Sequence, residues 1–466
     1  MTGALGVAWD SYRALRGGGP AIAARQARRL EELVRHARRH SRYYAQLYRD
    51  LPPGPVGPRD LPALPAVHKS TLMRHFEDWV TDPEVTRAGV EAFVADLTNV
   101  GTDFLGRYVV FTTSGSTAEP ALLIQDRQAV AVMMGLAYAR SAGVLPFRLL
   151  PRILARGARQ AAIFASGGHF LTATMFARQQ RRQPYRRRYA KYFSILDPLP
   201  ELVAELNEFQ PVLISTYASA LSVLADEQQA GRLRIAPLVI TSGGEMLLPG
   251  VRARAERIFG AVVVETYNAS EATPLSLPCR RGRMHVNADW FIVEPVDEAG
   301  NPVPAGQRSE TVLVTNLANY VQPVIRYELG DSVVIGTDPC ECGSPLPTIT
   351  TEGRTDEILR VPAVGGGQAV LLPLAISTVV EETPGVRQYQ ILQTGPAALS
   401  IRLAVDPGRS SADVGRLVRQ RLTDFLCAQG AAPEVSVGLS PDPPTANPRS
   451  GKLRHVLKTA TSARPR

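Results

Sequence analysis

The fold is decided by three similar stretches: PVLISTYAS at 211–219, PLVITSGGEML at 237–247 and GAVVVETYNASEA at 260–272. Each is a short run of aliphatic residues that ends in small polar residues, and sequence compatible with a helix separates the runs. GRYVVFTTSGSTAEP at 106–120 has the same order, and we predict a helix after it over 128–142. Short apolar strands that alternate with helices are typical of a doubly wound α/β domain.

The sequence before and after these segments has other hydrophobic patterns. Residues 20–48 carry apolar side chains at helical spacing and predict an amphipathic helix, which the Pro/Gly stretch 51–57 ends. From Gly282 onward, β-rich segments with turns replace the alternation of strands and helices. The C-terminal part alternates strands with a helix predicted over 413–427, which is enough for a small α+β domain.

A chain of 466 residues is too long for one simple domain. We place the boundary at Arg354, which gives a large domain over 1–353 and a small, mobile domain over 354–466. The predicted fold class is therefore α/β: doubly wound sheets and a β-rich subdomain in the large domain, followed by a small α+β C-terminal domain.

Composition excludes several classes of protein. Apolar residues make up 45% and charged residues 20%, which excludes a disordered or fibrous chain. The net charge of +9 comes mostly from scattered Arg, so we expect no nucleic-acid partner. The densest basic run, 178–191, fits a solvated helix face or a role in holding a phosphorylated ligand. No signal peptide or bilayer-length apolar run is visible, so we expect a cytoplasmic protein without a membrane partner; a homodimer stays open.

The loop Thr112–Thr117 is the first candidate for chemistry. Glycine and hydroxyl residues this dense, directly after a strand, can wrap a polyphosphate with N–H and O–H donors. A plain turn is the alternative. The loop is not a Walker loop, because GxxxxGK[ST] is absent from the chain, and it is not a nucleophile elbow, because GxSxG is absent.

The loop is the first of six motifs that follow one another along the chain. They are TTSGSTAEP at 112, SGGE at 242, YNASE at 267, RYELGD at 326, GRTDE at 353 and NPRSGKLRHV at 447. With these segments the chain resembles the adenylate-forming superfamily of acyl-CoA synthetases, specifically its phenylacetate-CoA ligase-like branch, over roughly residues 30–460.

The resemblance implies a role for each matching position. The β- and γ-phosphates of ATP would be held by Thr113, Ser114, Gly115, Ser116 and Thr117. The adenine pocket would be lined by Gly243, Gly244 and Glu245, with Tyr267 and its neighbour Asn268 against the base. Ser270 would contact the α-phosphate, Glu271 would ligate Mg²⁺ and Asp331 would accept both ribose hydroxyls. Arg354 would lie near the ribose and phosphate, Asp356 would be the hinge, and Lys452 would reach the reacting carboxylate from the C-terminal domain.

These roles imply an ATP-dependent acid ligase that forms an acyl-adenylate and releases pyrophosphate. Magnesium on Glu271 and the ammonium of Lys452 would offset the charge that develops on the leaving group. The resemblance favours an aromatic or compact acid and CoA as acceptor, and it places His169 and Tyr217 in the acyl pocket. For His169 a packed or capped side chain is the alternative reading. Taken singly, Glu271 also fits a helix N-terminal acid, Asp331 a turn residue and Lys452 an exposed basic residue.

The chain departs from the family pattern at three places, in the phosphate loop, beside Tyr267 and after Asp356, and only the last bears on the second step. Ala118 and Ala121 stand where many members have Gly and Lys, and Asn268 replaces a usual Gly. The segment 357–376 is longer than the compact loop that lines the pantetheine tunnel of members that use CoA. The alternatives are an amine, a carrier-protein thiol, nitrite activation or small-molecule adenylylation in a biosynthetic pathway. A catalytically inactive scaffold is the alternative from another class.

Four cysteines in a chain this long cannot form a disulfide scaffold. Cys279, His285, Cys340 and Cys342 provide three thiolates and one imidazole, which suits a closed, structural zinc site, and some phenylacetate ligase-like proteins have a similar metal knuckle. Three free thiols on turns are the alternative. We interpret Cys427 as a core residue on an apolar helix face.

Overall fold

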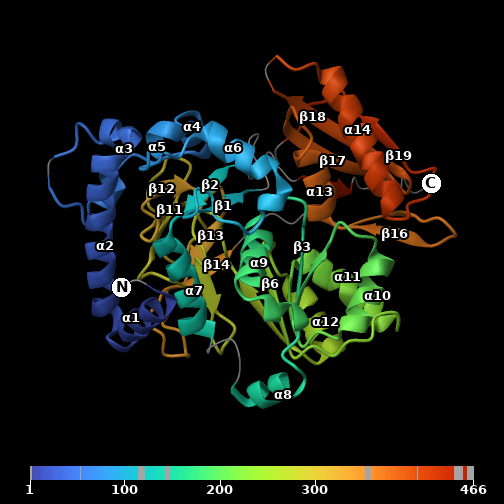
Figure 1. The fold of residues 1–466 in the computed structure, drawn as a ribbon, viewed down its shortest axis with the longest axis horizontal. Helices are drawn as coiled ribbons and strands as arrows, with labels where there is room; N and C mark the ends of the chain where they lie inside the picture. The colour runs from blue at the N-terminus through green and yellow to red at the C-terminus, as the bar shows by residue number, and fades with distance from the viewer. Residues whose placement is uncertain are drawn as a thin grey trace.

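A parallel sheet forms the centre of the computed structural model, which describes residues 3–52, 54–113, 121–141, 147–351, 358–406, 408–445 and 455–458. The sheet has five strands in the order β4-β3-β5-β6-β7. Its strands β3 and β6 are labelled in Figure 1. The strands are β3 (Gln160–Phe164), β4 (Ala190–Ser194), β5 (Leu213–Thr216), β6 (Val239–Gly243) and β7 (Val262–Thr266). All neighbouring pairs are parallel, so their carboxyl ends share one edge.

Helices cover both faces of this sheet, which confirms the doubly wound prediction. Ile163, Ile214 and Ile240 face the first layer and belong to the largest apolar core. That layer consists of α10 (Leu199–Phe209), α11 (Ala218–Gln229) and α12 (Pro249–Phe259). On the other face, α8 (Leu150–Ala155) packs through Ile153, and α9 (Leu171–Arg182) places Phe176 edge-on to Tyr192. Burying each large aliphatic side chain contributes about 1.5–3 kcal/mol.

The helix predicted over 20–48 is two helices, α2 (Gly18–His40) and α3 (Arg42–Leu47), and α1 (Ala4–Arg16) precedes them. The break falls at Ser41, whose backbone is extended and whose hydroxyl accepts a hydrogen bond from the Tyr44 amide. A serine in this position caps a new helix, so the apolar stripe continues across a helix boundary.

The rest of the N-terminal part joins these helices to the β-rich region. Its helices are α4 (Lys69–Arg74), α5 (Phe76–Trp79), α6 (Arg87–Ala95) and α7 (Arg127–Ser141), with short 3₁₀ turns at Leu61–Ala63, Leu97–Asn99, Phe147–Leu149 and Pro184–Arg188. The strands β1 (Val109–Thr112) and β2 (Leu122–Gln125) form an antiparallel hairpin. The helix α7 agrees closely with the prediction over 128–142. Among the described residues, no helix combines the length and apolar composition needed to cross a bilayer.

The β-rich prediction after Gly282 is confirmed. Two sheets form there, in the orders β10-β11-β12 and β13-β14-β9-β8. Their strands are β8 (Ser276–Pro278), β9 (Met284–Val286), β10 (Phe291–Val296), β11 (Thr311–Asn316), β12 (Val324–Glu328), β13 (Val333–Ile335) and β14 (Thr348–Thr351).

The C-terminal part is α+β, as predicted. The hairpin β15 (Leu359–Pro362) and β16 (Gln368–Leu371) precedes a sheet in the order β19-β18-β17-β20. The remaining elements are α13 (Pro373–Glu381), β17 (Val386–Gly395), β18 (Ala398–Val405), α14 (Ser411–Ala428), β19 (Ser436–Leu439) and β20 (Val456–Lys458). Cys427 on α14 is exposed, so its interpretation as a core residue was wrong. The buried face of α14 carries Val418, Leu422 and Leu426, and Cys427 lies one position beyond it.

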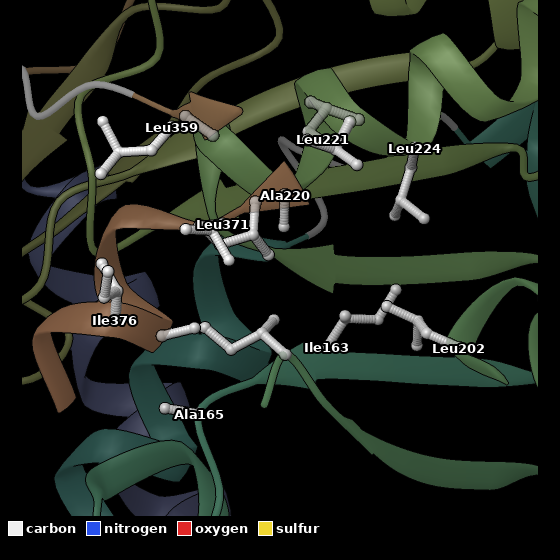
Figure 2. Close-up of a cluster of buried hydrophobic side chains, with 14 of the residues drawn as sticks. Ile163, Ala165, Leu202, Ala220, Leu221, Leu224, Leu359, Leu371 and Ile376 are labelled. Carbon is white, nitrogen blue, oxygen red and sulfur yellow. The ribbon is translucent and has the colours of Figure 1, made fainter. Parts of the chain in front are cut away.

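Apolar side chains join the C-terminal part to the parallel sheet (Figure 2). Leu371 and Ile376 are fully buried and belong to the same core cluster as Ile163 and Leu221. Polar contacts flank this interface: Arg360 pairs with Asp226 at 2.8 Å, and the Gln429 amide donates to the Leu196 carbonyl at 2.6 Å. The interface therefore holds the C-terminal part beside the carboxyl edge of the sheet.

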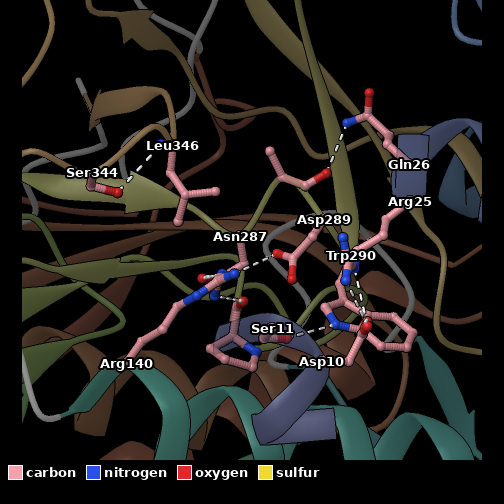
Figure 3. A network of polar contacts seen from close by, with 12 residues as sticks. Asp10, Ser11, Arg25, Gln26, Arg140, Asn287, Asp289, Trp290, Ser344 and Leu346 are labelled. Atoms are coloured by element: carbon pink, nitrogen blue, oxygen red, sulfur yellow. Dashed lines mark hydrogen bonds and ion pairs between the residues drawn. The ribbon is translucent and has the colours of Figure 1, made fainter. Parts of the chain in front are cut away.

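A buried polar network fixes the N-terminal helices to the β-rich region (Figure 3). Asp10 pairs with Arg25 and Arg29, and the Trp290 indole donates to the Ser11 hydroxyl at 3.1 Å. The Arg29 guanidinium lies 3.3 Å from the centre of the Trp290 ring. In the same network, Arg140 and Asp289 form a buried ion pair.

Arg140 and Asp289 are 2.6 Å apart, with side-chain exposures of 6% and 0%. We predict that Asp289→Ala lowers the free energy of unfolding by about 3–5 kcal/mol, because it leaves the Arg140 charge buried without its carboxylate partner. Chemical denaturation measures this loss. The control is Glu91→Ala, which removes the exposed pair with Arg87 and should cost less than about 0.5 kcal/mol. Equal losses in the two variants would contradict the prediction.

Candidate functional site

A cavity of about 480 Å³ lies at the carboxyl edge of the parallel sheet. Open α/β sheets bind ligands at this edge, where the strand-to-helix turns gather. Six predicted site residues line the cavity together: Thr113, Tyr217, Gly243, Gly244, Asn268 and Ser270. Other lining residues come from the ends of β3, β4, β5, β6 and β7, from the start of α9, and from Thr378 on α13.

Thr113 fixes the base of the predicted phosphate loop. Its amide donates to the Ala121 carbonyl at 3.2 Å, and its hydroxyl accepts from the Ala121 amide at 3.0 Å. The amide of its neighbour Thr112 donates to the His169 carbonyl at 2.9 Å. These bonds hold Thr112 and Thr113, the first two residues of the predicted loop, on the lining of the cavity.

The turn after β6 requires both of its glycines. A β-carbon at Gly243 would lie 2.8 Å from the Thr266 hydroxyl. Gly244 has a φ of +80°, and a β-carbon there would lie 2.9 Å from the Tyr217 ring. The Glu245 carboxylate accepts hydrogen bonds from the Ser219 amide at 2.7 Å and hydroxyl at 2.9 Å. Glu245 therefore caps the first turn of α11, beside the glycines that line the cavity.

Two carboxylates and two phenols form a cluster next to the cavity. The Tyr267 hydroxyl donates to Asp331 at 2.9 Å, and the Tyr327 hydroxyl donates to Glu271 at 3.0 Å. Asn268 and Ser270, between Tyr267 and Glu271 in sequence, line the cavity. The structure thus brings Tyr267, Glu271 and Asp331 together.

Electrostatics in this cluster are dominated by burial. Burial raises the pKa of Glu271, and the charge of Asp331 acts in the same direction. The Glu271 amide, the Tyr327 hydroxyl and the charge of Lys69 act in the opposite direction. Burial and the Asp331 carboxylate also raise the pKa of Tyr267. The phenols stay protonated near neutral pH and act as donors.

Sequence reasoning missed Lys69, which begins α4. The segment before it pairs with β12: the Val67 amide donates to the Arg326 carbonyl, and the Glu328 amide donates back to Val67, each at 3.0 Å. This pairing brings Lys69 close enough to lower the pKa of Glu271. No sequence motif marks this lysine, because its relation to Glu271 arises from strand pairing across more than two hundred residues.

Of the two residues assigned to the acyl pocket, only one lines the cavity. Tyr217 lines the cavity, and its ring stands edge-on to Phe164 with centroids 4.8 Å apart. His169 is outside the lining; its buried ring packs against Phe93, and its carbonyl holds Thr112. Burial lowers the pKa of His169, while Asp96 acts in the opposite direction.

The remaining predicted positions lie outside the described residues. They are Ser114, Gly115, Ser116, Thr117, Arg354, Asp356 and Lys452. The boundary at Arg354 falls there as well.

The four predicted metal ligands form one cluster between β8, β9 and the turn before β14. Their ligand atoms, from Cys279, His285, Cys340 and Cys342, all lie within 4.8 Å of one another. The Cys279 and Cys340 sulfurs are 3.8 Å apart, and the Cys342 sulfur is 3.4 Å from His285 Nε2. Tetrahedral zinc with its usual bond lengths needs separations of about 3.8 Å and about 3.6 Å. His285 Nδ1 lies 2.8 Å from the Leu346 carbonyl, so it is placed to donate and leave Nε2 for a metal.

Comparison with known proteins identifies the fold. No protein-family model matches the sequence. Protein CapK of Staphylococcus aureus is 25% identical over 133 residues, a stretch that covers 28% of this chain and 28% of that protein.

Solved structures of a 2-hydroxyisobutyryl-CoA ligase are similar over nearly the whole chain at 20% sequence identity. The complex with 2-HIB-AMP and CoA in the thioesterification state has a TM-score of 0.60 and covers 96% of this chain and 91% of that one. The postadenylation complex with R3-HIB-AMP has a TM-score of 0.54, with 95% and 89% covered. The chain therefore has the fold of the adenylate-forming ligases, with a large N-terminal and a small C-terminal domain.

Proposed function

We propose that the protein is an AMP-forming acid ligase of the phenylacetate-CoA ligase-like branch. It activates a carboxylic acid with ATP as an acyl-adenylate, releases pyrophosphate and transfers the acyl group to CoA. The observation that supports this most is the cavity itself. Thr113, Gly243, Gly244 and Ser270 line it, and the Glu271–Asp331 cluster lies beside it. The start of the predicted phosphate loop, the glycine turn after β6 and the acidic cluster lie close together, which supports a shared nucleotide site.

The chemistry is a displacement at phosphorus. A carboxylate oxygen of the acid bonds to the α-phosphorus, and the bond to the β-phosphate oxygen breaks with its electrons on pyrophosphate. Asp331 accepts the ribose hydroxyls, and Ser270 contacts the α-phosphate. Magnesium at Glu271 would supply positive charge for the leaving pyrophosphate. The buried carboxylate of Glu271 fits that role, because a nearby cation offsets the burial that raises its pKa.

Lys452 completes the site from the C-terminal domain, which we place at 354–466 and which turns about Asp356 between the two steps. Its ammonium stabilises the charge that develops at the α-phosphate. Rotation would break the Arg360–Asp226 pair and the Gln429–Leu196 hydrogen bond. CoA as acceptor is supported by the fold that the chain shares with the 2-hydroxyisobutyryl-CoA ligase, a protein whose solved structures include complexes with CoA.

Pyrophosphate exchange into ATP tests adenylation. We predict that the wild-type chain exchanges in the presence of an acid from a panel. Glu271→Gln and Lys452→Ala should each lower the rate by about two to three powers of ten, because each removes charge stabilisation of the transition state. The control Glu298→Gln changes an exposed carboxylate and should leave the rate within about twofold. Unchanged exchange in both site variants would contradict the assigned roles.

The acceptor is tested in the same reaction. CoA-dependent release of AMP identifies thioester formation, whereas release that depends on an amine or a carrier-protein thiol identifies the alternative acceptors. Nitrite belongs in the panel, since it is the non-carboxylate alternative. Folded protein that exchanges with no acid and not with nitrite would contradict the proposed function and favour a scaffold.

We propose structural zinc at Cys279, His285, Cys340 and Cys342, supported by the separations between their ligand atoms. Elemental analysis of chelator-free protein should find one zinc per chain. Cys340→Ser should abolish it and lower the thermal midpoint by at least about 2–4 °C, because metal binding stabilises the fold. Cys427→Ser, at an exposed thiol, is the control and should change neither. Protein without zinc would exclude the site.

A further inference from the structure

The described wall of the cavity contains no charged side chain. Its rings are Phe164, Phe170, Tyr192 and Tyr217, Asn268 contributes a neutral amide, and the other lining residues are small, aliphatic or hydroxyl-bearing. Two carboxylates interact with Tyr217 from outside this wall, and both have protein donors: Glu245 accepts from Ser219, and Glu381 accepts from the Tyr389 hydroxyl at 2.6 Å. A ligand here therefore meets aromatic and neutral polar groups.

On this wall the hydroxyls of Thr112, Thr172, Ser215, Thr241 and Ser270 make no hydrogen bond to another described residue, and the buried side-chain oxygen of Asn268 has no partner there either. Other hydroxyls close by are paired within the protein. Thr266 donates to the Ser242 carbonyl at 3.3 Å, and Tyr192 donates to the Ala165 carbonyl at 2.5 Å. Thr174 and Ser242, which do not line the cavity, also have hydroxyls without a partner, so what distinguishes Ser215 and Thr241 is their position on the lining, where a ligand can reach them.

The sheet itself places two of these hydroxyls side by side. Ser215 on β5 and Thr241 on β6 are direct register partners, so they point to the same face of the sheet. Their neighbours Ile214 and Ile240 point to the opposite face and are buried in the apolar core. A hydroxyl pair is unusual on the inner surface of a doubly wound sheet, whose strands are commonly apolar on both faces.

We infer that the hydroxyls of Ser215 and Thr241 form hydrogen bonds with a polar substituent of the acid. This inference rests on the proposed function and narrows its substrate: a monocarboxylic acid with an uncharged aromatic body that carries a hydroxyl or neutral amino group. The rings supply the walls for a flat body, and Ser215 and Thr241 supply donors and acceptors for the substituent. Thr172, at the start of α9, adds a third hydroxyl.

Other acids fit this wall less well. The ammonium group of an amino acid or the second carboxylate of a diacid would enter an uncharged site without a counter-ion, which is costly. A purely apolar acid would cover the two sheet hydroxyls and leave them unpaired, so the site discriminates against it.

The test compares matched acids in pyrophosphate exchange: benzoate, the three isomeric monohydroxybenzoates, 4-aminobenzoate and terephthalate. We expect the best hydroxy- or aminobenzoate to exceed benzoate in kcat/KM by about tenfold or more, and terephthalate to be the poorest. Thr241→Val is nearly isosteric and removes the hydroxyl, and Ser215→Ala does the same on β5. Each should lower kcat/KM for the preferred acid about tenfold and change that for benzoate less than threefold.

The matched control is Thr216→Val on the same strand. The Thr216 hydroxyl donates to the Ile163 carbonyl away from the cavity, so its loss can affect stability but not the ratio between acids. Because the ratio is measured within one preparation, partial misfolding of a variant does not change it. The expected outcome is an altered ratio in Thr241→Val and Ser215→Ala only.

Two results would overturn the inference while leaving adenylation intact: benzoate or terephthalate as the preferred acid, or an unchanged ratio in both cavity variants. If no acid supports exchange, the proposed function fails, and calorimetric binding of the same acids to the full chain decides the inference separately. Preferential binding of a hydroxybenzoate that Thr241→Val abolishes would uphold it. Equal binding of benzoate, or no binding of any acid, would end it.

Discussion

The candidate site depends on the parallel pairing of β3, β5, β6 and β7. Parallel strands bring their carboxyl ends to one edge, and the residues that follow each strand are then neighbours in space. Tyr217, Gly243 and Asn268 meet at the cavity because each lies at or just after the end of one of these strands. An antiparallel arrangement would send alternate turns to the opposite edge. The hydrogen bonds of the sheet thus determine which distant segments share a ligand.

The same edge is where the C-terminal part packs. Thr378 on α13 lines the cavity, and Ile376, two residues earlier, is buried in the core that contains Ile163. One helix therefore contributes to the ligand site and to the apolar interface. Any movement of this helix exposes apolar surface and changes the cavity wall together, at about 25 cal/mol for each Å² uncovered. Through α13, a ligand in the cavity would therefore contact the C-terminal part directly.

The sequence predicted the helices and strands better than it predicted which of them are neighbours in the fold. The aliphatic runs in the sequence predicted β5, β6 and β7. The family resemblance, which rests on the order of six motifs, assigned Tyr267 and Asp331 to the same nucleotide. Strand order was not predictable, because periodicity reports burial and not which strand is the neighbour. Lys69 was missed for that reason. Ser41 divides a continuous apolar stripe, since capping depends on one hydroxyl rather than on periodicity. Cys427 was misplaced because adjacent helical positions differ by about 100° in direction.

The acidic cluster places two carboxyl groups, those of Glu271 and Asp331, close to each other beside the cavity. Glu271 and Asp331 each accept a hydrogen bond from a phenol, and a phenol orients a carboxylate without cancelling its charge. An arginine in either phenol's place would form an ion pair and reduce the attraction for a further cation. Ionising a buried carboxyl group next to a second carboxylate is unfavourable, as the raised pKa of Glu271 indicates. The charge of Lys69 reduces that cost, and under the proposed function a bound magnesium ion would reduce it further.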